Sequence, residues 1–177
     1  MANTPKLRII PLGGVDEIGK NMTVFEYDRD IIVVDCGSMF PKDDMLGIDL
    51  VIPDASYLVA NKERVRGYVF THGHEDHIGA VPYVVSQVPA PLYGSRLTLA
   101  LIENKLREHY VSGVPLNTVE ARQVIQLGCF TVRFIKVNHS IPGAFALAIT
   151  CPIGTVVCSG DFKVDYTPID GEVTDLT

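Results

Sequence analysis

The chain has 177 residues, of which 47% are hydrophobic and 20% are charged, and this length suits one domain with a sizeable core. The balance excludes an intrinsically disordered chain, which combines low hydrophobicity with a high net charge. No apolar run approaches the roughly 18 residues that cross a membrane. Residues 1–6 (MANTPK) lack the apolar stretch of a secretory signal. We therefore expect a cytoplasmic protein without a membrane segment.

The formal net charge is −6, from 15 basic and 21 acidic residues. This charge argues against a protein that coats nucleic acid through a basic surface. It still allows a nucleic-acid enzyme, because bound divalent ions can supply positive charge locally. The four cysteines show no Cys-x-x-Cys spacing. We expect them to be reduced, mostly buried thiols and not a disulfide framework.

Apolar runs separated by turn residues predict the elements of the first part of the chain. Strands are expected at residues 7–12, 22–27, 31–34 and 67–70, with a hairpin turn at residues 28–30. Helices are expected at residues 55–62, 77–87 and 95–109. Ser95 is the expected N-cap of the last helix.

From residue 122 onward the pattern is typical of short strands. They are expected at residues 122–127, 131–137, 144–150 and 155–159, with a tight turn at residues 152–154. The order of strands, strand–helix units and further strands predicts a layered α/β domain. Residues 161–177 are polar and rich in turn residues, so we expect the chain to stop before the domain is finished.

The most informative segment is THGHEDHIG, at residues 71–79. Its His72, His74 and His77 are three of the five histidines of the chain, and Asp76 stands beside the third. If the backbone stays extended after the preceding strand, His72 and His74 point the same way. Imidazole nitrogens and carboxylate oxygens suit Zn²⁺ and also accept Mn²⁺ or Fe²⁺. Four potential ligands this close together indicate two adjacent ions.

Further ligands must then come from other loops. His139 and Asp161 each follow a predicted strand, where a rigid scaffold usually holds functional side chains. Alone, His139 would more often be a structural histidine, and Asp161 an ordinary turn residue. His109 is expected at the C-terminal end of a helix, where a cation suits the helix dipole, and we leave it outside the site.

Residues 72–77 (HGHEDH) match the His-x-His-x-Asp-His signature of the metallo-β-lactamase superfamily, and this signature identifies the superfamily alone. Segments outside it resemble the ribonuclease J family of bacteria. They are LGGVDEIGKN at 12–21, DCG at 35–37, DDMLGID at 43–49, VNHSIP at 137–142 and GDFK at 160–163. The resemblance extends from about residue 6 to residue 171.

The resemblance implies a metallo-β-lactamase αββα sandwich. In that family a nucleic-acid-specific β-CASP domain is inserted into the sandwich, and a smaller C-terminal domain follows. Residues 1–177 would be the N-terminal part of the metallo-β-lactamase domain, truncated before the insertion, and the β-CASP and C-terminal domains would be absent. The second sheet would then be incomplete. One further metal-ligating histidine and most groups that recognise RNA would lie outside the chain.

The resemblance also implies two divalent metal ions, with Zn²⁺ as the first expectation and Mn²⁺ as the alternative. One ion would be held by His72, His74 and His139. The second ion would be held by Asp76 and His77.

The same resemblance implies roles for other residues. Asp161 would bridge the two ions, and catalysis would depend on Asp76, His77 and Asp161. Asp35 would orient the metal-binding loop by hydrogen bonding, although alone it would be an ordinary aspartate at the end of a strand. Lys20 would contact a phosphate of the substrate.

The implied function is a metal-dependent ribonuclease that hydrolyses RNA phosphodiester bonds in RNA processing and decay, as a 5′-to-3′ exonuclease, an endonuclease or both. RNA would be the partner, with a homo-oligomer or an RNA-degradation complex for the full-length protein. The first alternative is another hydrolase of the superfamily, such as a thioesterase of the glyoxalase type. The second alternative is a fragment that is inactive on its own and, because half a sandwich exposes apolar surface, self-associates.

Overall fold

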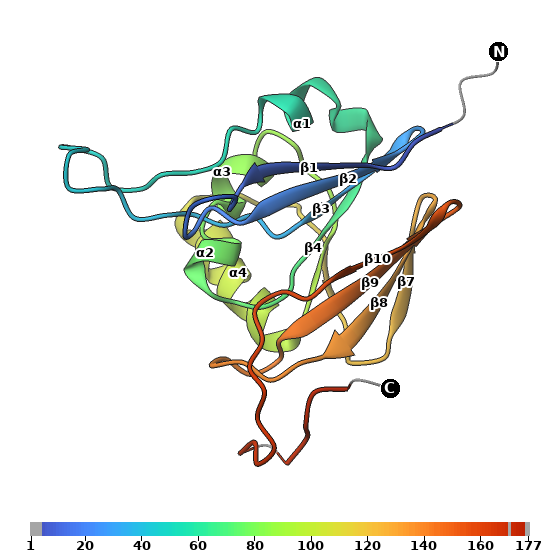
Figure 1. Ribbon diagram of the computed structural model, residues 1–177. Helices are drawn as coiled ribbons and strands as arrows, with labels where there is room; N and C mark the ends of the chain where they lie inside the picture. The colour runs from blue at the N-terminus through green and yellow to red at the C-terminus, as the bar shows by residue number, and fades with distance from the viewer. Residues whose placement is uncertain (1–4, 170, 176–177) are drawn as a thin grey trace.

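The computed structural model describes residues 5–169 and 171–175 as two β-sheets with helices on one side (Figure 1). The first sheet has six strands in chain order: β1 (Arg8–Gly13), β2 (Met22–Tyr27), β3 (Asp30–Val34), β4 (Val65–Val69), β5 (Leu92–Gly94) and β6 (Leu116–Thr118). The second sheet has the order β10-β9-β8-β7, from β7 (Val124–Leu127), β8 (Phe130–Lys136), β9 (Phe145–Cys151) and β10 (Gly154–Cys158). The helices are α1 (Ser56–Ala60), α2 (Glu75–Ile78), α3 (Val81–Val85) and α4 (Arg96–Glu108), with a 3-10 turn η1 (Lys62–Arg64).

The first sheet is mixed and the second is antiparallel. Strands β1, β2 and β3 pair antiparallel, whereas β3, β4, β5 and β6 pair in parallel. The predicted hairpin is confirmed, although Tyr27 pairs with Asp30 and the turn is therefore one residue shorter than expected. Parallel strands place their carboxyl ends at the same edge of a sheet, so the loops after β3 and β4 meet there.

Alternating side chains of β3 separate two hydrophobic layers. Ile31 and Val33 face α1, α3 and α4 and belong to one buried cluster. Ile32 and Val34 face the second sheet, where they join a cluster that contains Phe130. Full burial of each such side chain contributes about 1.5–3 kcal/mol to the free energy of unfolding. The central strands β2, β3 and β4 are thus buried on both faces, which explains why they are nearly continuously apolar.

The predicted helix at residues 77–87 is wrong as a single element. The structure has α2 and α3 there, separated at Gly79 and Ala80. Pro82 stands in the first turn of α3. Proline has no backbone N–H and is favoured in the first turn of a helix, so Pro82 starts α3 and does not lie inside a helix continuous with α2. Because of this break, α2 is a short helix within the histidine-containing segment.

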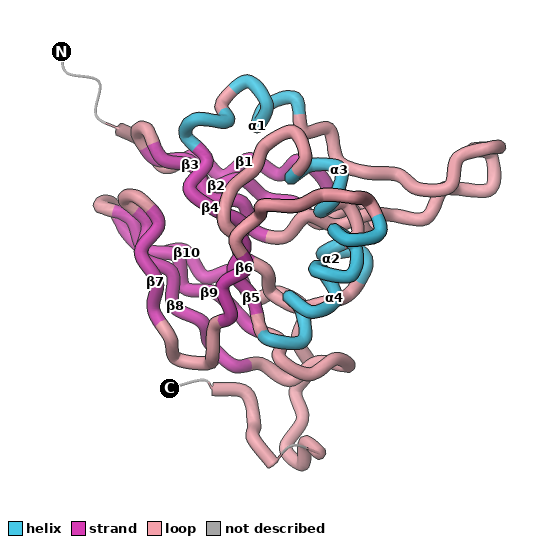
Figure 2. Tube along the Cα trace, turned by 180° about the vertical axis from the view of Figure 1, so that it is seen from behind, coloured by secondary structure: helices cyan, strands magenta, loops and turns pink. Residues whose placement is uncertain are grey.

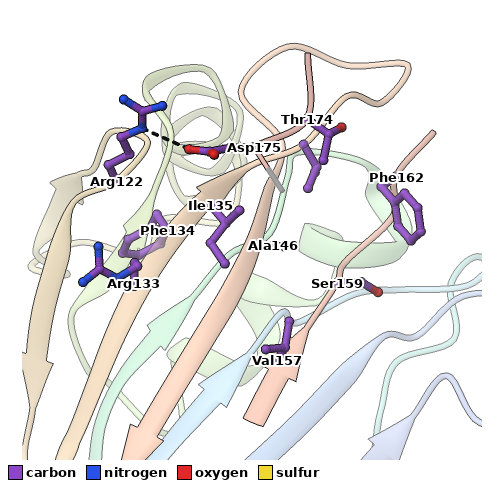
Figure 3. Close-up of a pocket in the computed structure, with 11 residues that line it drawn as sticks. Arg122, Arg133, Phe134, Ile135, Ala146, Val157, Ser159, Phe162, Thr174 and Asp175 are labelled. Atoms are coloured by element: carbon purple, nitrogen blue, oxygen red, sulfur yellow. Dashed lines mark hydrogen bonds and ion pairs between the residues drawn. The ribbon is translucent and has the colours of Figure 1, made fainter. Parts of the chain in front are cut away.

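The outer face of the four-stranded sheet is not covered by any helix of the described residues (Figure 2). A cavity of about 460 Å³ lies on this face. Among the residues that line this cavity, Ile135 and Ala146 lie at the centre and Val157 lies to one side (Figure 3). An ion pair between Arg122 and Asp175 lies on the other side (Figure 3). Three of the four layers of the expected αββα sandwich are therefore present in the described part of the chain.

Two further expectations concern cysteines and membrane helices. All four cysteines are free, with Cys36 and Cys151 buried and Cys129 and Cys158 half-buried. Burial raises the pKa of Cys129 to about 11, so this thiol stays protonated at neutral pH.

No helix in the described residues is both long enough and apolar enough to span a bilayer. Residues 1–4, 170, 176 and 177, on which parts of the predictions for the two chain ends fall, lie outside the described residues.

Candidate metal centre

Loops after four strands gather the candidate ligands and the supporting Asp35. Asp35 directly follows β3, and the segment that contains His72 follows β4. His139 and Asp161 follow β8 and β10 of the other sheet. The backbone N–H of Phe145 donates to the carbonyl oxygen of Thr71 at 2.8 Å, which ties the second sheet to the histidine loop. The ligands therefore come from both sheets at one end of the sandwich.

Three histidines converge on one point. His74 Nδ1 lies 3.0 Å from His72 Nε2 and 3.2 Å from His139 Nε2. A tetrahedral Zn²⁺ with Zn–N bonds of 2.0–2.1 Å requires nitrogens about 3.3 Å apart. These separations fit that requirement closely, so the three imidazoles suit one divalent ion with a position left for a further ligand.

A second group uses His72, His77 and Asp161, whose ligand atoms all lie within 4.8 Å of one another. Asp161 Oδ2 lies 3.6 Å from His77 Nε2 and 3.7 Å from His139 Nε2, so its carboxylate stands between the two groups. Asp76 Oδ2 also lies 3.6 Å from His77 Nε2. The six predicted ligands thus lie in one cluster. The carboxylate of Asp161 lies where it could bind both ions.

Asp35 fixes the proton positions of two of these histidines. Its carboxylate can only accept hydrogen bonds, and it accepts from the Thr71 hydroxyl at 2.8 Å and from His77 Nδ1 at 2.7 Å. Because the Thr71 proton is given to Asp35, the Thr71 oxygen accepts from His72 Nδ1 at 3.0 Å. In their neutral forms, His72 and His77 therefore carry the ring proton on Nδ1 and turn Nε2 toward the cluster without a proton, which is the form that binds a metal.

Burial controls the charge of these imidazoles. His72 is fully buried, and burial together with the neighbouring His77, His139 and His74 lowers its pKa to about 3. Burial would also lower the pKa of His77, but the hydrogen bond to Asp35 and the nearby carboxylates raise it above its usual value. His72 therefore stays neutral across the physiological range, with its lone pair available to a cation.

Gly37 permits the close packing of the site loops. A Cβ at this position would lie 1.6 Å from the carbonyl oxygen of Asp76. The backbone of Cys36 donates to the carbonyl oxygen of His77 at 2.8 Å, and Ser38 donates to that of Glu75 at 3.0 Å. The loop after β3 therefore packs directly against α2, and its backbone hydrogen bonds fix the backbone that carries Asp76 and His77.

Two residues that were not predicted as site residues also lie at the cluster. Thr71 and Asn21 both contact the cluster directly. Lys20 Nζ forms an ion pair with Glu17 at 3.1 Å, and its contact with a phosphate stays a prediction. His109 is the C-cap residue of α4 and packs edge-on against Tyr83, and neither group of candidate ligands in the described residues includes it.

Solved structures with low sequence identity share this fold. A protein of unknown function from Enterococcus faecalis V583 has a TM-score of 0.69 and 19% identity, over 90% of this chain and 44% of that one. The metallo-β-lactamase fold protein YhfI from Bacillus subtilis has a TM-score of 0.63 and 21% identity, over 93% of this chain and 66% of that one.

Curated relatives are much more similar in sequence. Ribonuclease J from Synechocystis sp. is 51% identical over 176 residues, which are 98% of this chain and 28% of the relative. Ribonuclease J2 from Bacillus subtilis is 44% identical over 98% of this chain and 32% of its own length. Ribonuclease J from Thermus thermophilus is 44% identical over 96% of this chain and 31% of its own length. The chain therefore spans about a third of the length of these relatives.

The resemblance seen in the sequence is thus matched by ribonuclease J relatives along almost the whole chain. A model of the metallo-beta-lactamase superfamily matches residues 15–174, which include all six candidate ligands and Asp35. Because this match covers most of the chain, the chain belongs to the metallo-β-lactamase superfamily.

Proposed function

We propose that the chain is the metal-binding part of a ribonuclease J-like enzyme that hydrolyses RNA phosphodiester bonds with two divalent ions. The observation that carries this proposal is the pair of ligand groups that share His72, with Asp161 facing both. Similarity to ribonucleases J along 96–98% of the chain favours RNA over a thioester as the substrate. Zn²⁺ suits the predominance of imidazole ligands, and Mn²⁺ is the alternative.

Each part of the site has a defined task in this proposal. Bound divalent ions would activate water for attack on phosphorus and stabilise charge on the phosphoryl oxygens. Asp35 and Thr71 hold His72 and His77 in the tautomer that leaves Nε2 unprotonated. The carboxylate of Asp76 or Asp161 would accept the proton released during the attack. Both side chains are partly exposed, so solvent can remove this proton.

The test compares RNA and thioester hydrolysis by the chain after it has been loaded with Zn²⁺ or Mn²⁺. We expect cleavage of single-stranded RNA, no cleavage of a thioester such as S-lactoylglutathione, and loss of RNA cleavage in His74→Ala. The control variant is His109→Ala, which removes a histidine outside the cluster and should cleave as the parent does. Thioester cleavage without RNA cleavage would overturn the proposal.

The chain covers about a third of its relatives, so the same assay belongs on any longer polypeptide that contains it. Cleavage by the longer form alone would support the ribonuclease and identify the 177-residue chain as an inactive part. The cytoplasmic location, the choice between exonuclease and endonuclease, a homo-oligomer and an RNA-degradation complex stay predictions.

A further inference from the structure

The segment that joins β1 to β2 contacts the metal centre through Asn21. The backbone N–H of Asn21 donates to the carbonyl oxygen of Asp76 at 3.0 Å, and its carbonyl oxygen accepts from the N–H of Gly37 at 2.9 Å. The backbone N–H of Lys20 donates to the carbonyl oxygen of Ser38 at 3.0 Å. Asn21 is therefore fixed between the loop that follows β3 and the helix α2.

The side-chain amide of Asn21 points at both ligands expected for the second ion. Nδ2 donates to the carbonyl oxygen of Asp76 at 3.1 Å and to Asp76 Oδ2 at 3.3 Å. The same nitrogen lies 3.1 Å from His77 Nε2, the ring atom that faces the cluster. Within the described part of the chain, Asn21 donates a hydrogen bond to the partly exposed Asp76 carboxylate.

Two glycines make this arrangement sterically possible. A Cβ at Gly13 would lie 2.3 Å from the carbonyl oxygen of Lys20, and one at Gly14 would lie 2.5 Å from Asn21 Oδ1. Gly14 also has a φ of +84°, which side-chain-bearing residues rarely adopt. Since Oδ1 of Asn21 packs on Gly14, the NH₂ group is directed toward Asp76 and His77. The glycine turn thus sets the orientation of the amide.

We propose that Asn21 is a positioning residue for the second metal ion, and that it holds Asp76 in place before the ion binds, while Asp35 holds the His77 ring from its other side. This inference rests on the two-ion arrangement of the proposed function. Side chains that are already held in position lose less conformational freedom when a ligand binds. The group of His72, His74 and His139 contains neither residue that Asn21 contacts, so the effect of Asn21 is confined to the second ion.

The experiment titrates the metal-free chain with Zn²⁺ in the presence of a chromophoric chelator, and separately with Co²⁺ while the absorption bands of the bound ion are recorded. The variants are Asn21→Ala, which removes the amide, and Asn21→Leu, which keeps its approximate volume without a donor. Loss of a hydrogen-bonding partner of metal ligands typically weakens metal binding about 10- to 100-fold. We expect a loss of this size for the second equivalent in both variants, with the first equivalent unchanged.

Asn117→Ala is the matched control, because Asn117 also donates through Nδ2 to a backbone carbonyl oxygen, that of Leu92, and lies on the edge strand β6, which carries no candidate ligand. It should bind both equivalents as the parent chain does. Binding of both equivalents with parental affinity by Asn21→Leu would overturn the inference, and so would equal weakening of both equivalents with a lower melting temperature, because either result indicates a steric or general structural contribution. A parent chain that binds one equivalent would instead overturn the two-ion arrangement itself.

Discussion

Asp35 supports two metal-binding imidazoles through one buried carboxylate. Replacing it with alanine leaves Thr71 and His77 without their acceptor and frees both rings to change tautomer. We expect Asp35→Ala to weaken metal binding about 10- to 100-fold, measured by competition with a chelator. Asp54→Ala is the control, because Asp54 accepts hydrogen bonds from Ser56 at an exposed turn. Unchanged metal affinity in Asp35→Ala would contradict this account of the site.

Glu26 makes the stability of the fold dependent on pH. It is buried on β2 and accepts hydrogen bonds from Tyr57 and from Arg64, the latter at 2.7 Å. Burial alone would raise the pKa of Glu26, but these partners and Arg8 lower it below the ordinary 4.5. A lowered pKa in the folded state means that the stabilising effect is complete above the unfolded-state pKa. It is lost as the pH falls through the folded-state value.

We therefore expect Glu26→Gln to lower the free energy of unfolding by about 1–3 kcal/mol at pH 7. The difference from the parent should shrink as the pH falls below about 4.5, where the parent carboxylate also becomes neutral. Urea denaturation at several pH values measures both effects. Glu63→Gln, at an exposed position of η1, should match the parent throughout. A difference that stays constant from pH 7 to pH 3 would show that the charge of Glu26 contributes nothing.

At the level of single residues, the sequence predicted the candidate ligands and the supporting role of Asp35, but not the contacts that Thr71 and Asn21 make with them. The spacing of His72, His74 and His77 is a strong local pattern, and it pointed to a metal centre. Thr71 and Asn21 carry no such pattern, because a single threonine or asparagine is common in loops. Their contacts depend on how β2, β3 and β4 pack together, and local sequence does not specify that packing.

At the element scale, the loop after β3 must approach α2 closely for the site to form. Gly37→Ala would place a methyl group 1.6 Å from the carbonyl oxygen of Asp76, so one of the two backbones must move. We expect a lower melting temperature and much weaker binding of the second metal ion, measured by thermal denaturation and metal titration. Gly94→Ala is the matched control, because its new methyl group would meet its nearest neighbour at an ordinary 3.4 Å. Equal behaviour of the two variants would refute the close-packing argument.

Long elements were predictable from the sequence, and very short ones were not. The 13-residue helix α4 was expected with Ser95 as its N-cap, and Ser95 Oγ does accept from the Thr98 N–H. Strands β5 and β6 have three residues each and were missed, because three residues are too few to show a period of two. They exist because β5 pairs with the edge of β4 and β6 pairs in turn with the edge of β5.

At the scale of the whole molecule, the uncovered outer face of the four-stranded sheet dominates the expected behaviour in solution. Val157 is 65% exposed and Phe162 is 55% exposed beside the 460 Å³ cavity. We expect the 177-residue chain to bind a hydrophobic fluorescent dye and to self-associate with rising concentration, as exposed apolar patches usually do. Dye fluorescence and sedimentation velocity measure these two properties.

Val157→Lys should reduce both effects, whereas Val59→Lys should not, because Val59 is 41% exposed on α1 and belongs to the helical layer. A monodisperse monomer that melts cooperatively and binds no dye would contradict the expectation.

The central claim is that the cluster of histidines and aspartates binds two divalent ions. The most direct test is elemental analysis of the metal content per chain, on protein purified without chelator and again after reconstitution with Zn²⁺ or Mn²⁺. We expect close to two equivalents, with His74→Ala losing the ion held by the three histidines and Asp161→Ala losing the ion shared with His77. A chain that holds no ion even after reconstitution would contradict the claim.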